Sequence, residues 1–196
     1  PEKYNIIPIY ITKSGKWYSG DALFNVENYR DTKKLIAQCE EVYVRPNYGD
    51  TNLYRCNKSL FQKEVVAKLD VVVPALHGTN CEDGTFQGVM EIAGIPYAGC
   101  NTLASANGMD KITMKMILKE CGVPVIDYCW FSDKEWFDRQ DAVVERIEGK
   151  LGFPVIVKPA NLGSSVGIKA AHNREELVEA IENAIQFTNR IIIEKY

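Results

Sequence analysis

The sequence lacks three features that would each place the chain in a particular class of protein. No apolar segment reaches the roughly 20 residues that a membrane-spanning helix needs, and no signal-peptide pattern opens the chain. Lys and Arg number 23 against 26 Asp and Glu, for a formal net charge of −3, so the basic field that nucleic-acid binding needs is lacking. We therefore expect a cytoplasmic protein that binds neither a membrane nor nucleic acid.

A paired-cysteine motif is also lacking. The six cysteines include no C-x-x-C pair and are scattered over Cys39, Cys56, Cys81, Cys100, Cys121 and Cys129. In an acidic chain of 196 residues, such cysteines are more often reduced packing residues than zinc ligands or a disulfide framework. We expect no metal-ligating residue in this chain.

Length and composition allow a folded protein with one sizeable core or two small ones, since 46% of the 196 residues are hydrophobic. The chain begins with proline and ends inside a strand-like run, residues 190–196. Because a strand that ends a chain lacks the partners that would cover it, we expect a fragment of a longer protein.

A β-α-β pattern stands out in the first half. The continuous apolar run 70–77 predicts a strand covered on both faces, and 95–99 predicts a second strand. Between them, apolar residues at 86, 89, 90 and 93 follow the helical period. The first half therefore predicts a parallel α/β domain, with His77 at the carboxyl end of a strand, where it would hydrogen-bond near a ligand. Glu82 and Asp83 are better explained as negative charge at a helix N-terminus.

The second half reads β-α-β-β-α-β in two layers, with antiparallel pairing across a Gly/Ser hairpin. A helix with Asp110 as its N-cap precedes this pattern, and its apolar positions are 114, 117, 118 and 121. Lys111 lies in the first turn, at the wrong end for the helix dipole, so it needs a partner such as a phosphate or a carboxylate. A solvated lysine is the alternative, at a cost of only about a few tenths of a kcal/mol.

The most informative stretch is the apolar run 155–157, which Lys158 and Pro159 follow. The next loop, Gly163-Ser-Ser-Val-Gly167, leaves backbone N–H groups free beside that lysine. The combination suits a polyanion, most plausibly the phosphates of a nucleotide. It is not a Walker A loop, because no Gly-Lys-Ser/Thr follows. An ordinary hairpin with a chance lysine is the alternative.

Five motifs occur in one order along the chain: His77-Gly-x-x-x-Glu-Asp-Gly-x-x-Gln-Gly88, Ile95-Pro-Tyr-x-Gly99, Ser105-Ala-x-x-Met-Asp-Lys111, Gly152-x-Pro-x-x-Val-Lys-Pro159 and Gly163-Ser-Ser-x-Gly167. This order closely resembles the D-alanine–D-alanine ligase family, with its D-lactate and D-serine relatives, in the ATP-grasp superfamily. The resemblance is dense over 69–196 and loose over 4–68. Any one motif alone would be unspecific.

The resemblance implies an α/β fold: a parallel, Rossmann-like (pre-ATP-grasp) N-terminal domain over 1–101, then the first α+β subdomain of an ATP-grasp domain over 102–196. It implies that a further domain carries the magnesium ligands beyond Tyr196, so that this fragment alone is inactive. D-alanine and ATP are the implied partners, magnesium the implied metal, and a homodimer stays open.

Several residues match the family's functional positions. Lys111 and Lys158 match the two lysines that contact ATP phosphates. Ser164, with Ser165 beside it, matches the loop serine that hydrogen-bonds at the active site, and His77 matches the histidine near the carboxylate of the first D-alanine. Adenine and ribose contacts are implied for Glu194, Lys195 and Tyr196. One departure is Cys81, which stands where the family usually has glycine.

The implied reaction is ATP-dependent synthesis of D-alanyl-D-alanine, a peptidoglycan precursor, through an acyl phosphate. One alternative is another ATP-grasp ligase that joins a different carboxylate and amine, including the D-alanine–D-serine and D-alanine–D-lactate types. The other alternative, from a different class, is a non-catalytic nucleotide-binding module.

Overall fold

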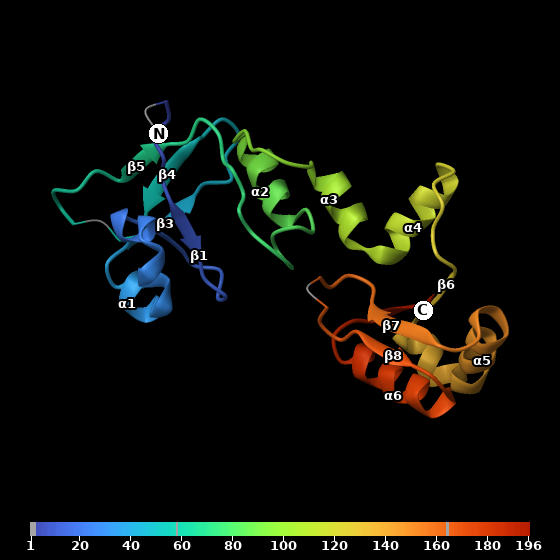
Figure 1. The fold of residues 1–196 in the computed structure, drawn as a ribbon. Helices are drawn as coiled ribbons and strands as arrows, with labels where there is room; N and C mark the ends of the chain where they lie inside the picture. The colour runs from blue at the N-terminus through green and yellow to red at the C-terminus, as the bar shows by residue number, and fades with distance from the viewer. Residues whose placement is uncertain (1–2, 58, 164) are drawn as a thin grey trace. The chain divides into compact units, whose positions relative to one another are not determined.

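The computed structural model describes residues 3–57, 59–163 and 165–196, and the chain divides into two compact units (Figure 1). The first unit comprises the chain up to Pro74 together with Gly88–Gly99. The second comprises Ala75–Gln87 and Cys100–Tyr196. None of the helices in the described part of the chain has the length and apolar character to cross a membrane.

A five-stranded sheet organises the first unit, in the spatial order β1-β2-β3-β4-β5. All four pairings are antiparallel, for example Tyr10 opposite Tyr18 and Val42 opposite Arg55. The strands are β1 (Ile9–Ile11), β2 (Trp17–Ser19), β3 (Glu40–Val44), β4 (Asn52–Arg55) and β5 (Val65–Lys68), drawn from blue to teal in Figure 1.

The predicted parallel pairing is therefore wrong for this sheet, although the α/β class is confirmed. Short connections join some successive strands, such as the turn in which Thr12 N–H donates to Lys16 O at 2.9 Å, and antiparallel pairs need no more than that. Parallel pairing survives as one bridge, Val72 opposite Tyr97. Val72 precedes helix α2 (Thr85–Ala93) and Tyr97 follows it. The predicted β-α-β order is therefore present, but the two predicted strands pair through this single bridge.

Short helices complete the first unit: η1 (Asp21–Phe24), η2 (Val26–Arg30) and α1 (Thr32–Ile36). Asp31 caps α1 by accepting from Lys34 N–H at 3.1 Å. The core side chains of this unit come from these helices, the sheet, α2 and the segment directly after α2, and include Leu23, Leu35, Val42, Leu53, Met90 and Ile95.

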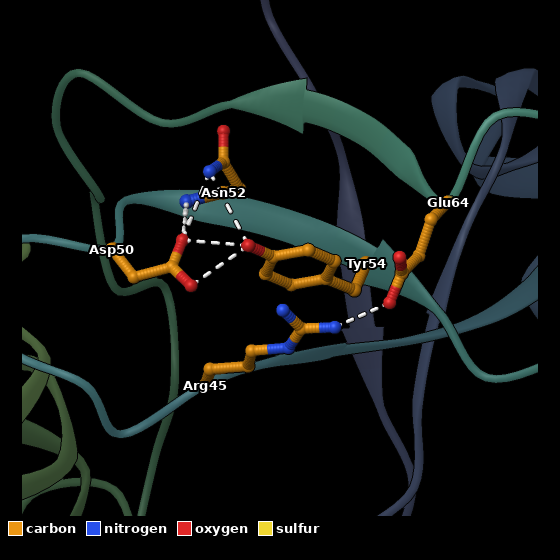
Figure 2. Close-up of polar contacts among 5 residues, drawn as sticks. All are labelled: Arg45, Asp50, Asn52, Tyr54 and Glu64. Carbon is orange, nitrogen blue, oxygen red and sulfur yellow. Dashed lines mark hydrogen bonds and ion pairs between the residues drawn. The ribbon is translucent and has the colours of Figure 1, made fainter.

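Tyr54 of β4 lies at the centre of a polar cluster in the first unit (Figure 2). Its hydroxyl donates to Asp50, 2.8 and 2.7 Å from the two carboxylate oxygens, and Asn52 Nδ2 also donates to Asp50 at 2.9 Å. The Arg45 guanidinium lies over the Tyr54 ring at 3.9 Å from its centroid and pairs with Glu64. The cluster ties the loop before β4 to the sheet.

The second unit confirms the predicted β-α-β-β-α-β order. Helices α3 (Thr102–Met109) and α4 (Lys111–Glu120) come first. The pattern then runs through β6 (Tyr128–Ser132), α5 (Asp133–Leu151), β7 (Val155–Pro159), β8 (Lys169–Ala171), α6 (Arg174–Ile185) and β9 (Arg190–Lys195). The sheet order is β6-β9-β7-β8, with every pairing antiparallel, including the predicted hairpin of β7 and β8.

The two faces of this sheet pack against different helices and carry apolar clusters of different size. Side chains of one face pack with α5 and α6 in a large apolar core that includes Phe131, Trp136, Val157, Ile181 and Ile193. On the opposite face, Ile192 packs in a much smaller cluster with Ile112 of α4 and Ala160. Polar side chains share that second face.

Candidate functional site

Strand alternation places Lys158 and Glu194 on the sheet face opposite the large core. In β7, Val155 and Val157 are fully buried in that core, so Lys158 points to the other face. In the register of β7 with β9, Ile156 lies opposite Glu194 and Lys158 opposite Ile192. Lys158 and Glu194 are therefore diagonal neighbours on one face.

Glu194 binds two lysines, one through each carboxylate oxygen. Lys158 Nζ is 2.5 Å from Glu194 Oε2, and Lys115 Nζ of α4 is 3.1 Å from Oε1. The Glu194 side chain is 9% exposed, Lys115 10% and Lys158 21%. Burial alone would raise the pKa of the Glu194 carboxyl, but the hydrogen bonds and positive charges of both lysines outweigh burial and hold its pKa below the ordinary value.

Lys111 reaches the loop that follows β7. Its Nζ donates to the carbonyl oxygens of Pro159 and Leu162 at 3.3 and 2.5 Å, and its backbone N–H donates to Ala160 O at 2.9 Å. Burial, with the nearby Lys158 charge, lowers the pKa of Lys111. The predicted need for a partner is met here by carbonyls, and not by a carboxylate.

Asp110 fixes the start of α4 in the way that the sequence predicts. Its Oδ1 accepts from Thr113 N–H at 2.8 Å, which caps the helix. Its Oδ2 accepts from Arg190 Nη1 at 2.7 Å. The helix that carries Lys111 and Lys115 is therefore joined to β9.

The Gly/Ser loop connects β7 to β8. Ser164 lies outside the described residues. Ser165 is exposed and has a positive φ of 61°, and Gly167 has a φ of 71°. A Cβ at Gly167 would lie 2.8 Å from Pro159 Cγ and 2.9 Å from Phe187 Cδ2, so glycine lets the loop return against β7.

The last strand leads to the residues for which the family resemblance implies nucleotide contacts. Lys195 N–H donates to Asp127 O at 3.0 Å, and Tyr196 N–H to Pro154 O at 3.2 Å. Both side chains are exposed, whereas that of Glu194 is buried.

His77 lies in a separate loop of the second unit, with its side chain 90% exposed and its Nδ1 3.9 Å from Glu82 Oε1.

The same loop leads into helix α2. Asp83 Oδ1 accepts from Thr85 N–H at 3.1 Å, which confirms the helix N-terminal role predicted for Asp83. The Cys81 carbonyl accepts from Gln87 Nε2 at 3.1 Å, and burial raises the pKa of the Cys81 thiol. No contact found among the described residues joins His77 to the lysines.

The structure thus brings Lys111, Lys158 and Glu194 together and adds Lys115, which sequence reasoning missed. The available signal was its spacing: Lys115 lies four residues after Lys111, on the same helix face. Glu194 pairs with two of these three lysines, and Lys111 lies close enough to feel the Lys158 charge, so positive charge is in excess beside a glycine-rich loop. This arrangement suits an anionic group such as a phosphate.

Comparisons show that this chain is similar to known proteins over its whole length. Residues 1–100 match the family model described as D-ala D-ala ligase N-terminus, and residues 117–196 match D-ala D-ala ligase C-terminus. A D-alanine–D-alanine ligase of Thermosipho melanesiensis is 40% identical over 198 residues, covering 100% of this chain and 51% of that relative. The chain spans about half the length of the curated relatives it matches.

Solved structures of such ligases are also similar to this chain. The VanG D-Ala:D-Ser ligase from Enterococcus faecalis has a TM-score of 0.82 at 35% identity, over 100% of this chain and 54% of that one. A D-alanine–D-alanine ligase from Bacillus anthracis complexed with ATP has a TM-score of 0.56 at 36% identity, over 65% of this chain and 40% of that one. The two family models, which match residues 1–100 and 117–196, show that this chain belongs to the D-alanine–D-alanine ligase family.

Proposed function

We propose that this chain contributes the phosphate-binding lysines of an enzyme that joins two D-alanines at the expense of ATP, in the cytoplasm, for peptidoglycan synthesis. The observation that carries the proposal is the pair of lysines at the buried Glu194 carboxylate, next to Lys111 and the Gly/Ser loop. Membership in the ligase family supports it.

The reaction has two steps. A carboxylate oxygen of one D-alanine attacks the γ-phosphorus of ATP, and the bond to the β-phosphate oxygen breaks to give an acyl phosphate and ADP. The amino nitrogen of a second D-alanine then attacks the acyl carbon. A C–N bond forms, the C–O bond to phosphate breaks, and the amine loses a proton.

Within this scheme the residues of this chain supply charge and position. Lys111 and Lys158 neutralise charge on the phosphates, which is the main requirement of phosphoryl transfer. The Gly/Ser loop, with Ser164 and Ser165, covers the phosphates and excludes water, which would hydrolyse the acyl phosphate. We assign the adenine and ribose contacts to Glu194, Lys195 and Tyr196, and the carboxylate of the first D-alanine to His77.

We further propose that the chain divides between residues 101 and 102. Residues 1–101 form a substrate-side domain, and residues 102–196 form the first ATP-grasp subdomain. Magnesium, which the family resemblance implies, has no matching ligand set here: the described residues contain no cluster of three or more His, Cys, Asp or Glu suited to a metal ion. No step of the proposal is therefore assigned to metal ligands of this chain.

D-serine is the second candidate for the attacking amine, because the VanG structure from Enterococcus faecalis, a D-Ala:D-Ser ligase, has a TM-score of 0.82 over the whole of this chain. Relatives named as D-alanine–D-alanine ligases match at 40 to 42% identity, against 35% for VanG, so we favour D-alanine.

The test is product identity. The complete gene product that contains this chain is incubated with ATP, magnesium and D-alanine, with or without D-serine or D-lactate, and the products are separated and weighed by mass spectrometry. We expect D-alanyl-D-alanine, with one phosphate released per dipeptide. ATP hydrolysis without a ligated product would contradict the proposal, and a mixed product would move the assignment to the D-serine or D-lactate type.

A further inference from the structure

We propose that Lys115 is a positioning residue, which holds the Glu194 carboxylate so that Lys158 stays available to the phosphates of ATP. The inference rests on the proposed function, and it assigns a role to a lysine outside the family motifs identified in the sequence.

The geometry separates the two lysines by the oxygen that each one binds. Lys115 Nζ lies 3.1 Å from Oε1 of Glu194, while Lys158 Nζ lies 2.5 Å from Oε2. Neither lysine competes with the other for a lone pair. The carboxylate is thus neutralised from the helix side by Lys115, and the sheet lysine Lys158 is a second partner.

Lys115 is also the more enclosed of the two. Its side chain is 10% exposed against 21% for Lys158, and its Nζ lies 5.6 Å from the centroid of the Tyr128 ring. One turn earlier, the fully buried Ile112 packs against Ile192 and fixes the same helix face to the sheet. Lys115 is therefore enclosed by its own helix, a carboxylate and an aromatic ring, so that, of the two lysines bound to Glu194, Lys158 has the better access to a ligand.

The consequence follows from charge. A buried carboxylate needs compensation, and if Lys115 were removed, Lys158 would be the remaining ion-pair partner of Glu194 among the described residues. Lys158 would then be held by Glu194 and would give less of its charge to a phosphate. With Lys115 present, Glu194 is neutralised already. Lys115 thus acts on ATP through Glu194 and Lys158 without contacting ATP itself.

The experiment measures steady-state kinetics of the complete gene product carrying Lys115→Met, Lys115→Gln or Lys115→Arg. We expect the KM for ATP to rise about tenfold or more in the Met and Gln variants, while the KM for D-alanine changes by less than about threefold. Lys115→Arg restores the charge and should recover most of the ATP affinity. The matched control is Lys119→Met, an exposed lysine one turn later on α4, which should leave both constants unchanged.

A double-mutant cycle with Glu194→Gln separates positioning from simple loss of charge. If Lys115 acts through Glu194, then Lys115→Met should add little to the ATP KM once Glu194 is already Gln. An equal penalty in both backgrounds would overturn the inference, because it would show that Lys115 acts as an independent charge. Equal ATP KM values for Lys115→Met, Lys115→Gln and Lys119→Met would also overturn it.

Failure of the inference is distinguishable from failure of the proposed function. A wild-type protein without D-alanine-dependent ATP turnover contradicts the function itself, whereas an active wild type with an insensitive Lys115 contradicts only the positioning role. If Lys115→Met does not fold, the Gln and Arg variants carry the test, since both keep a polar group within the buried pair.

Discussion

Arg190 Nη1 of β9 and Asp110 Oδ2, at the N-cap of α4, form an ion pair of 2.7 Å, with side chains 37% and 15% exposed. The same Asp110 side chain caps α4 through Thr113 N–H. Asp110→Ala should therefore lower the free energy of unfolding by about 1–2 kcal/mol, because both the cap and the ion pair are lost.

The control is Asp110→Asn, which keeps a capping oxygen and loses the negative charge, and which should cost less than half as much in urea unfolding. Equal losses for the Ala and Asn variants would show that the ion pair, and not the cap, dominates at this position.

Gly167→Ala should disrupt the return of the Gly/Ser loop. The added Cβ would meet Pro159 and Phe187 below 3.0 Å, and the positive φ of 71° adds strain. Gly122→Ala is the matched control, because its φ of 73° is nearly the same and the added Cβ would have no neighbouring atom within 4 Å. We expect a loss of about 1 kcal/mol for Gly122→Ala from φ alone, and about 1–3 kcal/mol more for Gly167→Ala. Similar urea midpoints for the two variants would contradict this steric argument.

Glu194 should contribute a pH-dependent part of the stability. Its pKa is lowered in the folded state, so its contribution is full above the ordinary value of 4.5 and disappears as the pH falls through the lowered folded-state pKa. Glu194→Gln should be less stable than the wild type at pH 7, and the difference in unfolding free energy should shrink below pH 4.5. A difference that grows as the pH falls would mean that the carboxyl is destabilising when ionised.

Tyr54→Phe should weaken the cluster of Figure 2, because the ring stays while the bonds from its hydroxyl to Asp50 are lost. The half-buried Asp50 carboxylate then keeps only Asn52 among these side-chain donors, so the urea midpoint should fall. Tyr48→Phe, in a side chain that is 88% exposed, should leave the midpoint unchanged. An unchanged urea midpoint for Tyr54→Phe would show that the hydrogen bonds of the Tyr54 hydroxyl do not stabilise the fold.

Local signals in the second unit were strong enough to predict its elements in order. The β-branched run between two prolines became β7, and Asp110, Ser132 and Asn173 cap the helices that follow them. The lysine at the end of β7 was therefore predictable as a site residue, since strand alternation turns it away from the core.

The α4 face was not predictable in the same way. Its expected apolar positions included Ile117, which is 43% exposed when the whole residue is counted, whereas Lys115 is 8% exposed on the same whole-residue measure. A lysine in a helix is expected to be exposed to solvent unless a buried partner is known. The partner of Lys115, Glu194, is 79 residues distant in the sequence. Strands β4 and β5 carry no comparably strong local signal, because each has only four residues and a register shift between Leu53 and Tyr54 interrupts their pairing.

The most direct test of the account compares ATP kinetics of the complete gene product with and without Lys158. Lys158→Ala removes the cation that lies on the sheet face opposite the large core, beside the Gly/Ser loop. We predict that D-alanine-dependent phosphate release falls at least about 100-fold in kcat/KM for ATP, since a charge on the transferred phosphoryl group loses its counterion. Wild-type kinetics in the Lys158→Ala variant would contradict the assignment of this cluster to ATP.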